Sequence, residues 1–268
     1  MEILYSCYVV LASLALGSFL GMAVVRIPKG ESLIRPRSHC PECSRTLSWF
    51  ENIPLLSFLV LRGRCRGCGV KISPHYFFVE LLTAALSLYA FWRIQPFGRF
   101  LLFEFALILP LILLLSLDWK YLLLPDAITL PGIGVGFIVR IVDAHYFFHV
   151  SSLWKILLDS FLGAALGFLT LFLLALIYRK LRGIEGMGGG DFKLAAMLGA
   201  FFGWKAIFFI FFIASLLGIL YGVLGILTKR FSRQTQLPFG SFLAASALLF
   251  FFHGPALLHA YLRLFKFR

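Results

Sequence analysis

The sequence predicts an all-α polytopic membrane protein with about eight transmembrane helices and a small cytoplasmic domain built from a four-cysteine loop. Of the 268 residues, 60% are hydrophobic and only 14% are charged. The mean hydropathy is +0.92, and several apolar runs reach the roughly 20 residues that cross a bilayer as a helix. A soluble domain of this size could not bury so much apolar surface, so a membrane protein is predicted.

In a soluble protein, the net charge of +13 would suggest nucleic acid as a partner. The basic residues cluster in a few loops beside apolar segments. An excess of Lys and Arg in the cytoplasmic loops of membrane proteins explains this arrangement. We therefore expect membrane lipid around the chain and no nucleic acid as a partner.

The first apolar segment, Ile3–Val25, is long enough to span a bilayer and has no basic region before it. It therefore predicts a transmembrane helix and not a cleaved signal peptide. Seven more apolar segments follow, which gives eight spans, two of them short. They are Tyr76–Trp92, Phe97–Leu117, Ala127–Val142, Ser152–Tyr178, Phe192–Gly203, Ala206–Leu227 and Phe239–His259.

The loop Arg26–His75 holds nine Lys or Arg and three Glu, which predicts that it is cytoplasmic and that the N-terminus lies outside. The predicted organisation is a first transmembrane helix at 1–25, a cytoplasmic four-cysteine domain at 26–75, and a transmembrane core at 76–268. In this topology the basic tail after His259 lies outside the cytoplasm, a position that the cytoplasmic preference of Lys and Arg disfavours. Either its charges matter little or one short segment does not span.

The cytoplasmic loop carries two Cys-x-x-Cys pairs, Cys40 with Cys43 and Cys65 with Cys68, separated by 21 residues. Four thiolates complete a tetrahedral shell around zinc and leave no open position, so a structural zinc ion is predicted. Two disulfides or four free thiols are the alternatives, and a cytoplasmic loop disfavours the disulfides. The fifth cysteine, Cys7, falls within the first apolar segment, where it is expected only to pack.

Two aspartates lie where apolar segments meet polar stretches: Asp118 ends the third span, and Asp191 begins the sixth. An acid at the edge of the hydrocarbon is costly and indicates a functional site. Two carboxyl groups that share a site can divide the roles of acid and base, which is the chemistry of an aspartyl protease. The pair is therefore the candidate catalytic site.

Each aspartate also has a simpler explanation. Asp191 could cap or begin a helix, although this would not explain the flexible glycine run Gly188–Gly190 that precedes it. Asp118 could pair with Lys120. A third candidate, Asp126, follows a proline and is typical of a turn and a helix start. Two further acids within predicted spans, Glu80 and Glu104, could orient helices or bond to the pair.

The chain resembles the type IV prepilin peptidases, membrane aspartyl proteases of the Gly-x-Gly-Asp class that also methylate their product. The resemblance extends over nearly the whole chain, and each motif alone would be weak. One departure is Gly189, where the family often carries a larger residue, and another is Arg64, where relatives often have Lys. The matching motifs are Gly17–Leu20, Arg26–Ser32, Ser38–Cys43, Glu51–Pro54, Leu61–Cys65, Ser73–Pro74, Glu80–Thr83, Leu117–Asp118, Leu124–Asp126, Gly186–Lys193 and Pro238–Gly240.

This resemblance implies that Asp118 and Asp191 are the catalytic pair, supported by Gly188, Gly190, Lys193 and Asp126. It implies a prepilin or pseudopilin substrate whose basic leader is cut after a Gly, before a residue that is usually Phe. S-adenosylmethionine is then expected to methylate the new amine, and the cysteine loop is implicated through Glu51, Gly63 and Arg64. The expected location is the bacterial inner membrane, with the active site at its cytoplasmic face.

Three rival functions are a peptidase without methyltransferase activity, a proton-coupled transporter, and a zinc-anchored scaffold without chemistry. The complete cysteine loop argues against the first. A transporter should have paired halves or matching interrupted helices, which the sequence lacks. A scaffold would not need acids at membrane depth.

Overall fold

A computed structural model describes residues 2–149, 152–183, 186–232 and 235–264 of the chain. These residues form helices and no strand; the one β-type pairing among them consists of two isolated antiparallel bridges in the cysteine loop. The predicted all-α membrane fold is confirmed. The chain divides into two compact units, Met1–Ser116 and Leu117–Arg268, while the predicted boundaries at 25 and 75 stay a prediction.

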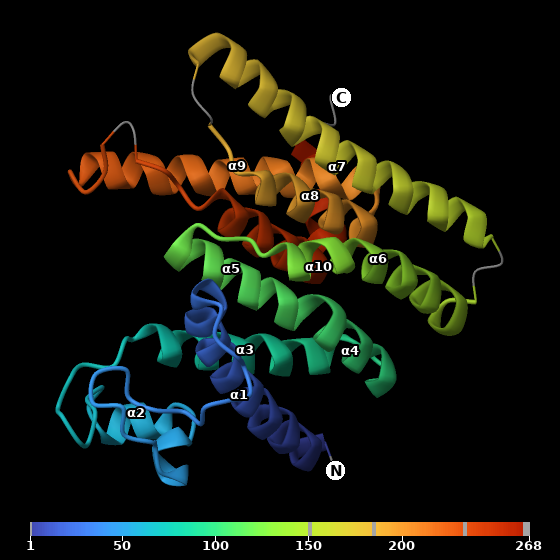
Figure 1. Ribbon diagram of the computed structural model, residues 1–268. Helices are drawn as coiled ribbons and strands as arrows, with labels where there is room; N and C mark the ends of the chain where they lie inside the picture. Colours follow the sequence, from blue (N-terminus) through green and yellow to red (C-terminus); the bar gives the residue numbers. More distant parts are fainter. Residues whose placement is uncertain (1, 150–151, 184–185, 233–234, 265–268) are drawn as a thin grey trace. The chain divides into compact units, whose positions relative to one another are not determined.

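In the first unit, α1 (Glu2–Arg26) packs along α3 (His75–Arg93), as Figure 1 shows. The two helices approach closely because Gly17 has no side chain. A Cβ at this position would lie 2.8 Å from the backbone Cα of Glu80. Small residues permit such approaches between membrane helices, where lipid removes the hydrophobic drive for association.

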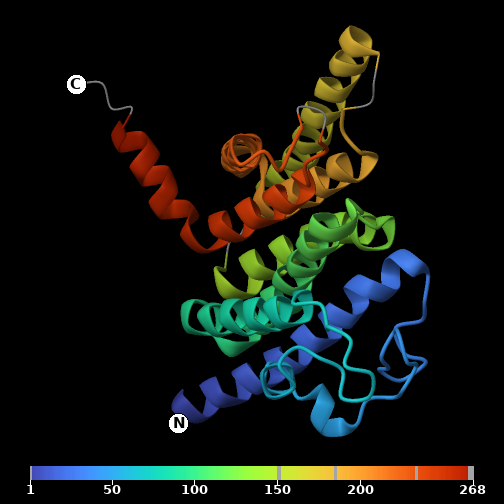
Figure 2. The same ribbon diagram turned by 90° about the vertical axis from the view of Figure 1, so that its left-hand side faces the viewer.

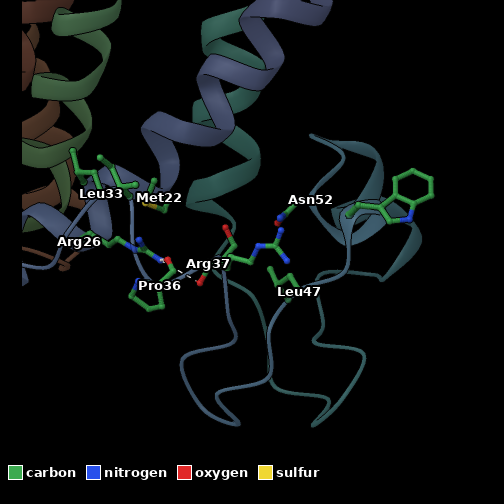
Figure 3. Close-up of a pocket in the computed structure, with 10 residues that line it drawn as sticks. Met22, Arg26, Leu33, Pro36, Arg37, Leu47 and Asn52 are labelled. Carbon is green, nitrogen blue, oxygen red and sulfur yellow. Dashed lines mark hydrogen bonds between the residues drawn. The ribbon is translucent and has the colours of Figure 1, made fainter.

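The four-cysteine loop leaves α1 and returns to α3, and it contains only short helices (Figure 2). They are η1 (Ile27–Lys29), η2 (Trp49–Asn52) and α2 (Leu56–Val60). Arg26, at the end of α1, donates to the carbonyl oxygen of Ser32 at 2.9 Å and to that of Pro36 at 2.8 Å (Figure 3). Glu80 of α3 accepts the N–H of Leu55 at 2.7 Å. The first part of the loop is therefore tied to α1, and its middle is tied to α3.

The first unit ends in a nearly continuous helical stretch that runs on into the second unit. It consists of α4 (Phe97–Phe103), the π-helical turn η3 (Glu104–Ile108) and α5 (Leu109–Tyr121). Glu104 is buried within this stretch and accepts a hydrogen bond from Ser87 at 2.5 Å. Glu104 and Glu80 thus both make helix-orienting or loop-anchoring bonds within residues 1–116, as one of the sequence alternatives predicts.

The second unit is arranged around one short, buried helix. Its helices are α6 (Asp126–Val142) with the π-helical turn η4 (Asp143–Phe147), α7 (Leu153–Arg182), α8 (Gly189–Phe202), α9 (Trp204–Leu227) and α10 (Phe239–Leu264). The buried helix is α8, which packs against each of α6, α7, α9 and α10. All residues from Leu194 to Phe201 are buried.

Glycines allow the backbone of α8 to approach two of these neighbours. On α7, a Cβ at Gly163 or Gly167 would lie 2.3 or 2.4 Å from a carbonyl oxygen of α8. On α6, a Cβ at Gly132 or Gly136 would collide with side chains of α8 at 2.5 and 2.9 Å. Each neighbour therefore presents a Gly-x-x-x-Gly face to α8, the small-residue pattern of close membrane helix pairs.

All eight predicted spans fall on helices. Five described stretches are long and apolar enough to cross a membrane: Ile3–Lys29, Phe97–Tyr121, Asp126–Phe147, Leu153–Arg182 and Trp204–Leu227. With 14 residues, α8 extends about 21 Å, less than the ~30 Å hydrocarbon core, as expected for one of the two short segments. Residues 265–268 of the basic tail lie outside the described residues.

We expect Gly167→Ala to destabilise the protein, because its methyl group would enter the carbonyl oxygen of Ala195 and force α7 away from α8. Overpacking of this kind costs roughly 1–3 kcal/mol, measurable as a lower thermal unfolding midpoint in detergent. Gly134→Ala is the matched control, because a Cβ there meets nothing within 4 Å. Equal unfolding midpoints for the two variants would contradict this packing.

Candidate functional site

Asp118 lies near the end of α5 and is almost fully buried, with 4% of its surface exposed. One oxygen, Oδ2, accepts two hydrogen bonds from Ser241 of α10: the backbone N–H donates at 2.6 Å and the hydroxyl at 2.9 Å. The backbone donors in the first turn of a helix attract anions. Asp118 therefore acts as a capping anion for α10 from a different helix.

Asp191 lies in the first turn of α8 and is also buried, with 9% exposed. Its N–H donates to the carbonyl oxygen of Gly188 at 3.2 Å, which begins the helix. Among the residues that the structure describes, its Oδ1 is buried and has no hydrogen-bond partner. A buried acceptor without a partner is costly, and such an atom is available to a substrate or a water molecule.

The two carboxyl groups, 73 positions apart in sequence, are close enough for a direct Coulombic interaction. Both belong to the second unit, so one compact set of helices holds the pair. Each carboxyl group lies at the N-terminal end of a helix. Asp191 is in the first turn of α8, and Asp118 accepts hydrogen bonds from Ser241 in the first turn of α10. The predicted pairing of these aspartates is therefore compatible with the fold, while their catalytic role stays a prediction.

The turn after α5 packs between the glycines that adjoin the two aspartates. Leu122 has a positive φ of 52°, which redirects the chain sharply after α5. The buried Leu124 then packs where Gly190 and Gly240 leave room. A Cβ at Gly190 would lie 2.7 Å from Leu124 Cβ, and one at Gly240 would lie 2.6 Å from Leu124 Cδ1. Leu124 therefore packs against the first turns of both α8 and α10.

The remaining predicted supporting residues surround this centre. Lys193 donates to both carboxylate oxygens of Asp126 at 2.7 Å, linking the starts of α8 and α6. Gly188 precedes α8 as its N-cap. A Cβ at Gly189 would meet nothing within 4 Å, so the first atom of a side chain has open space at this position. Lys120, the alternative partner of Asp118, lies instead over the ring of Tyr121 at 5.0 Å.

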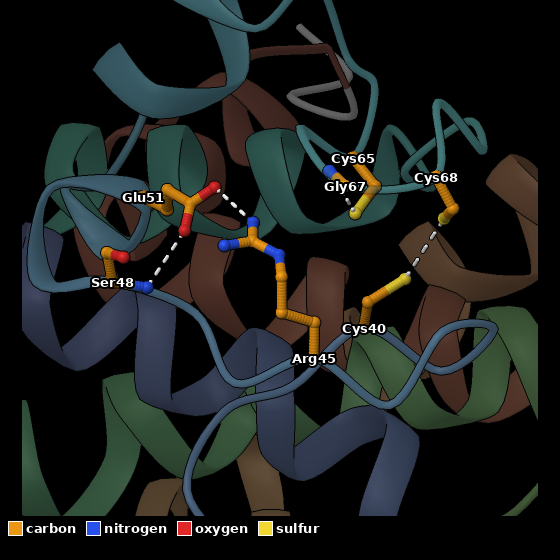
Figure 4. A network of polar contacts seen from close by, with 7 residues as sticks. All are labelled: Cys40, Arg45, Ser48, Glu51, Cys65, Gly67 and Cys68. Carbon is orange, nitrogen blue, oxygen red and sulfur yellow. Dashed lines mark hydrogen bonds and ion pairs between the residues drawn. The ribbon is translucent and has the colours of Figure 1, made fainter.

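The four cysteines of the loop form one cluster. Their sulfur atoms all lie within 4.8 Å of one another, and those of Cys40 and Cys68 are 3.8 Å apart (Figure 4). Tetrahedral thiolates at about 2.3 Å from zinc are roughly 3.8 Å from each other. The donor set and its spacing therefore fit a metal ion, and none of the four cysteines forms a disulfide.

The two halves of the cluster repeat one backbone arrangement. In the first, Cys40 N–H donates to Arg45 O and Ser44 N–H donates to Cys40 O, at 3.0 and 2.9 Å. In the second, the same two bonds run from Cys65 to Val70 and from Gly69 to Cys65, both at 2.9 Å. Backbone N–H groups of Cys68 and Gly67 lower the pKa of the Cys65 thiol to about 6, while burial and hydrogen bonds with the other three thiols raise the pKa of the Cys68 thiol to about 11. A thiolate is the metal-binding form of cysteine.

Glu51 is buried beside the cluster and is fully engaged. Arg45 donates to its Oε1 at 2.5 Å, and the N–H of Ser48 donates to its Oε2 at 2.8 Å (Figure 4). These contacts lower the pKa of the Glu51 carboxyl, Arg45 contributing most. These contacts occupy the carboxylate within the loop, and the predicted link of Glu51 to methyl transfer stays a prediction.

The other two residues linked by sequence to methyl transfer shape the start of the second cysteine knuckle. Gly63 has a positive φ of 63°, and a Cβ there would lie 3.0 Å from the ring of Phe58. Arg64 is exposed and forms the antiparallel bridge with Lys71. The sequence reasoning missed Ser241 and Arg45, and it named Leu124 only as part of the motif Leu124–Asp126. Ser241 directly follows the motif Pro238–Gly240, whose position was the available signal.

Comparisons with known proteins match both parts of the chain. A model of the Bacterial Peptidase A24 N-terminal domain matches residues 11–94, and one of the Type IV leader peptidase family matches residues 105–223. No solved structure matches the chain.

Curated relatives extend the match over nearly the full length. A prepilin leader peptidase/N-methyltransferase of Aeromonas salmonicida (strain A449) is 35% identical, covering 97% of this chain and 94% of the relative. Proteins of the same name from Pseudomonas aeruginosa (strain PAO1) and Myxococcus xanthus (strain DK1622) are 34% and 38% identical. These matches cover 97% and 87% of this chain, and 94% and 67% of the relatives.

We expect Glu51→Gln to loosen the cysteine loop, because it removes the charge that Arg45 and the Ser48 N–H share. Limited proteolysis of the purified protein should cut the loop several-fold faster than in wild type. Glu42→Gln is the matched control, an exposed acid in the same loop. Equal cleavage rates in the two variants would show that the buried carboxylate does not stabilise the loop.

Proposed function

The chain belongs to the type IV leader peptidase family, and we propose that it cleaves the leader from prepilins or pseudopilins and then N-methylates the new N-terminus. The observation that carries the proposal is the pair of buried aspartates, Asp118 and Asp191, from different helices and within Coulombic reach of each other. A scaffold would have no use for such a pair, because burying two acids is costly.

The contacts of the pair support a division of labour in amide hydrolysis. Asp118 accepts two hydrogen bonds on one oxygen, as suits an ionised carboxylate, and it would take a proton from the attacking water. Asp191, with its unpartnered Oδ1, would carry the shared proton, donate to the carbonyl oxygen of the scissile bond, and later protonate the leaving amine.

The cysteine loop would bind one structural zinc ion and serve methyl transfer. Four protein thiolates leave no open position for catalysis, so the metal would hold the loop's two knuckles together. S-adenosylmethionine would supply the methyl group to the new amine. The names of the relatives combine both activities, which disfavours a peptidase without methyl transfer.

We place the protein in the bacterial inner membrane, with the aspartates at the cytoplasmic face. The basic loop of nine Lys or Arg supports a cytoplasmic position for residues 26–75. Exposed apolar side chains such as Phe212 and Leu227 on α9 are 65% and 72% exposed and would face lipid. Pilus assembly or type II secretion would supply the substrates.

Asp118→Asn and Asp191→Asn should each lower leader cleavage at least ~100-fold, the scale of a lost general acid or base. The measurement is mass spectrometry of a prepilin incubated with purified full-length protein. Asp126→Asn is the comparison variant, since an exposed ion pair with Lys193 is worth about 1 kcal/mol or less. A cleaving Asp118→Asn with an inactive Asp126→Asn would reverse the choice of the first aspartate.

Metal analysis should find about one zinc ion per chain, lost when Cys40 and Cys65 are both changed to Ser. This double variant should depress methylation more than cleavage, because the aspartate pair belongs to a separate compact unit. Cys7→Ser, outside the cluster, is the control and should keep its metal. A metal-free wild type with two disulfides would refute the zinc site. Equal loss of the cleaved and the methylated product in the double variant would contradict the assignment of methyl transfer to the loop.

A further inference from the structure

A cavity of about 370 Å³ lies between the end of α1 and the first half of the cysteine loop. It is contained in the first compact unit. Figure 3 shows Met22, Leu33, Arg26 and Pro36 grouped near α1, and Arg37, Leu47 and Asn52 grouped farther along the loop. Its volume is within the ~300–1,000 Å³ that is typical of small-molecule sites.

The two arginines of the cavity differ in their availability. Arg26 is buried, and its guanidinium donates to carbonyl oxygens of the loop, so it serves the fold. Arg37 is exposed, and within the described part of the chain its guanidinium forms no hydrogen bond or ion pair. Arginine binds carboxylates through two parallel N–H groups. The cavity thus has one guanidinium ready for an acidic group of a ligand.

The short helix η2 contributes two other ligand-binding groups. Trp49 begins this helix and is 80% exposed, and Asn52 ends it. An indole face stacks on a planar ring or attracts a cation, and a carboxamide both donates and accepts hydrogen bonds. Apolar side chains, including Met22 and Leu47, complete the lining.

We propose that this cavity binds S-adenosylmethionine, with Arg37 on its carboxylate, Asn52 on a polar group of the nucleoside, and Trp49 against the adenine or the sulfonium. The inference rests on the methyl transfer proposed above and names its binding site. One cation, one amide, one aromatic ring and an apolar floor match a ligand that combines a carboxylate, a nucleoside and a sulfonium cation.

Glu51 and the cysteine cluster position this site. Both η2 residues at the cavity belong to a helix whose first turn is fixed by the reciprocal Ser48–Glu51 capping box. Arg45 connects Glu51 to the first cysteine knuckle, because its carbonyl oxygen accepts the N–H of Cys40 while its guanidinium binds Glu51. Loss of the metal would therefore reach Trp49 and Asn52 through two bonds. Glu51 is a positioning residue in this arrangement.

An anionic lipid headgroup is the main competing ligand for a basic cavity at a helix end. Recognition of lipid phosphate by charge generally uses clusters of several Lys and Arg. Here Arg26 is committed to backbone carbonyls, which leaves Arg37 as the available guanidinium among the described lining residues. The mixed polar, aromatic and apolar lining favours the nucleoside ligand.

The test uses purified full-length protein in detergent and tritiated S-adenosylmethionine. Equilibrium binding is measured for wild type, Arg37→Gln and Trp49→Ala. Arg35→Gln, an exposed arginine of the same loop outside the lining, is the matched control. Zinc content reports whether each loop is folded. Ultraviolet crosslinking of the ligand to wild type, followed by peptide mapping, locates the bound molecule without any substitution.

We expect Arg37→Gln and Trp49→Ala to weaken binding about tenfold or more with zinc retained, the scale of a lost charge-assisted contact. Arg35→Gln should bind as wild type does, and the crosslink should map within residues 33–52. If a variant loses its zinc, its loop is no longer folded, and the position of the crosslink in wild type then decides whether this cavity binds the ligand.

Wild-type affinity in both lining variants, or a crosslink elsewhere, would overturn this assignment. If wild type still methylates a prepilin in that case, the proposed function stands and the site lies elsewhere. A wild type that neither binds the ligand nor methylates would refute methyl transfer and this site together. If Arg37→Gln instead reduces only the binding of phosphatidylglycerol, measured by native mass spectrometry, the cavity is a lipid site.

Discussion

Close packing of the backbone of α8 against its neighbours is the constraint on which the aspartate site depends. Lipid removes the hydrophobic advantage of helix association, so contact must come from van der Waals packing between small residues. Gly163 and Gly167 of α7 meet carbonyl oxygens of α8 directly, and Gly132 and Gly136 of α6 admit its larger side chains. These contacts fix the position of α8, which is itself too short to span the bilayer. Asp191 is consequently held at a set depth within the unit.

The site also requires that Asp118, near the end of α5, lie at the same depth as Asp191. The turn after α5 fixes this position. The positive φ of Leu122 redirects the chain, and Leu124 then occupies the space left by Gly190 and Gly240. Because these glycines adjoin Asp191 and Ser241, one leucine contacts the starts of both helices that bear on the acids. The N-terminal ends of α8 and α10 also present positive dipole ends to the carboxylates, which offsets part of the cost of burying them.

The sequence predicts much of the fold because hydrophobic segments of bilayer length have one main structural solution. All eight predicted segments are helical, and the Cys-x-x-Cys spacing predicts the cluster because ligand spacing in such knuckles is local. Contacts that depend on tertiary packing are harder to foresee. No local pattern joins Ser241 to Asp118, and Arg45 is one of nine basic residues in its loop. The Gly-x-x-x-Gly pairs on α6 and α7 are a signal that the sequence reasoning did not use, and they identify the faces that meet α8.

The cysteine loop illustrates how a domain of about 50 residues becomes ordered with little hydrophobic core, since small scaffolds of this kind commonly add a structural metal or disulfides. Its two knuckles repeat the same pair of backbone bonds, although the turn that closes them uses Ser44 in one and Gly69 in the other, with φ of 54° and 72°. The repetition brings four thiols together, and an arginine of each knuckle connects it to η2. Arg45 belongs to the first knuckle through its backbone and binds Glu51 through its side chain, and Arg66 of the second knuckle lies over the ring of Phe50 at 5.5 Å. The order imposed by a metal would thus extend to η2 through these two arginines, so a metal without an open position would still influence the methyl transfer proposed for this loop.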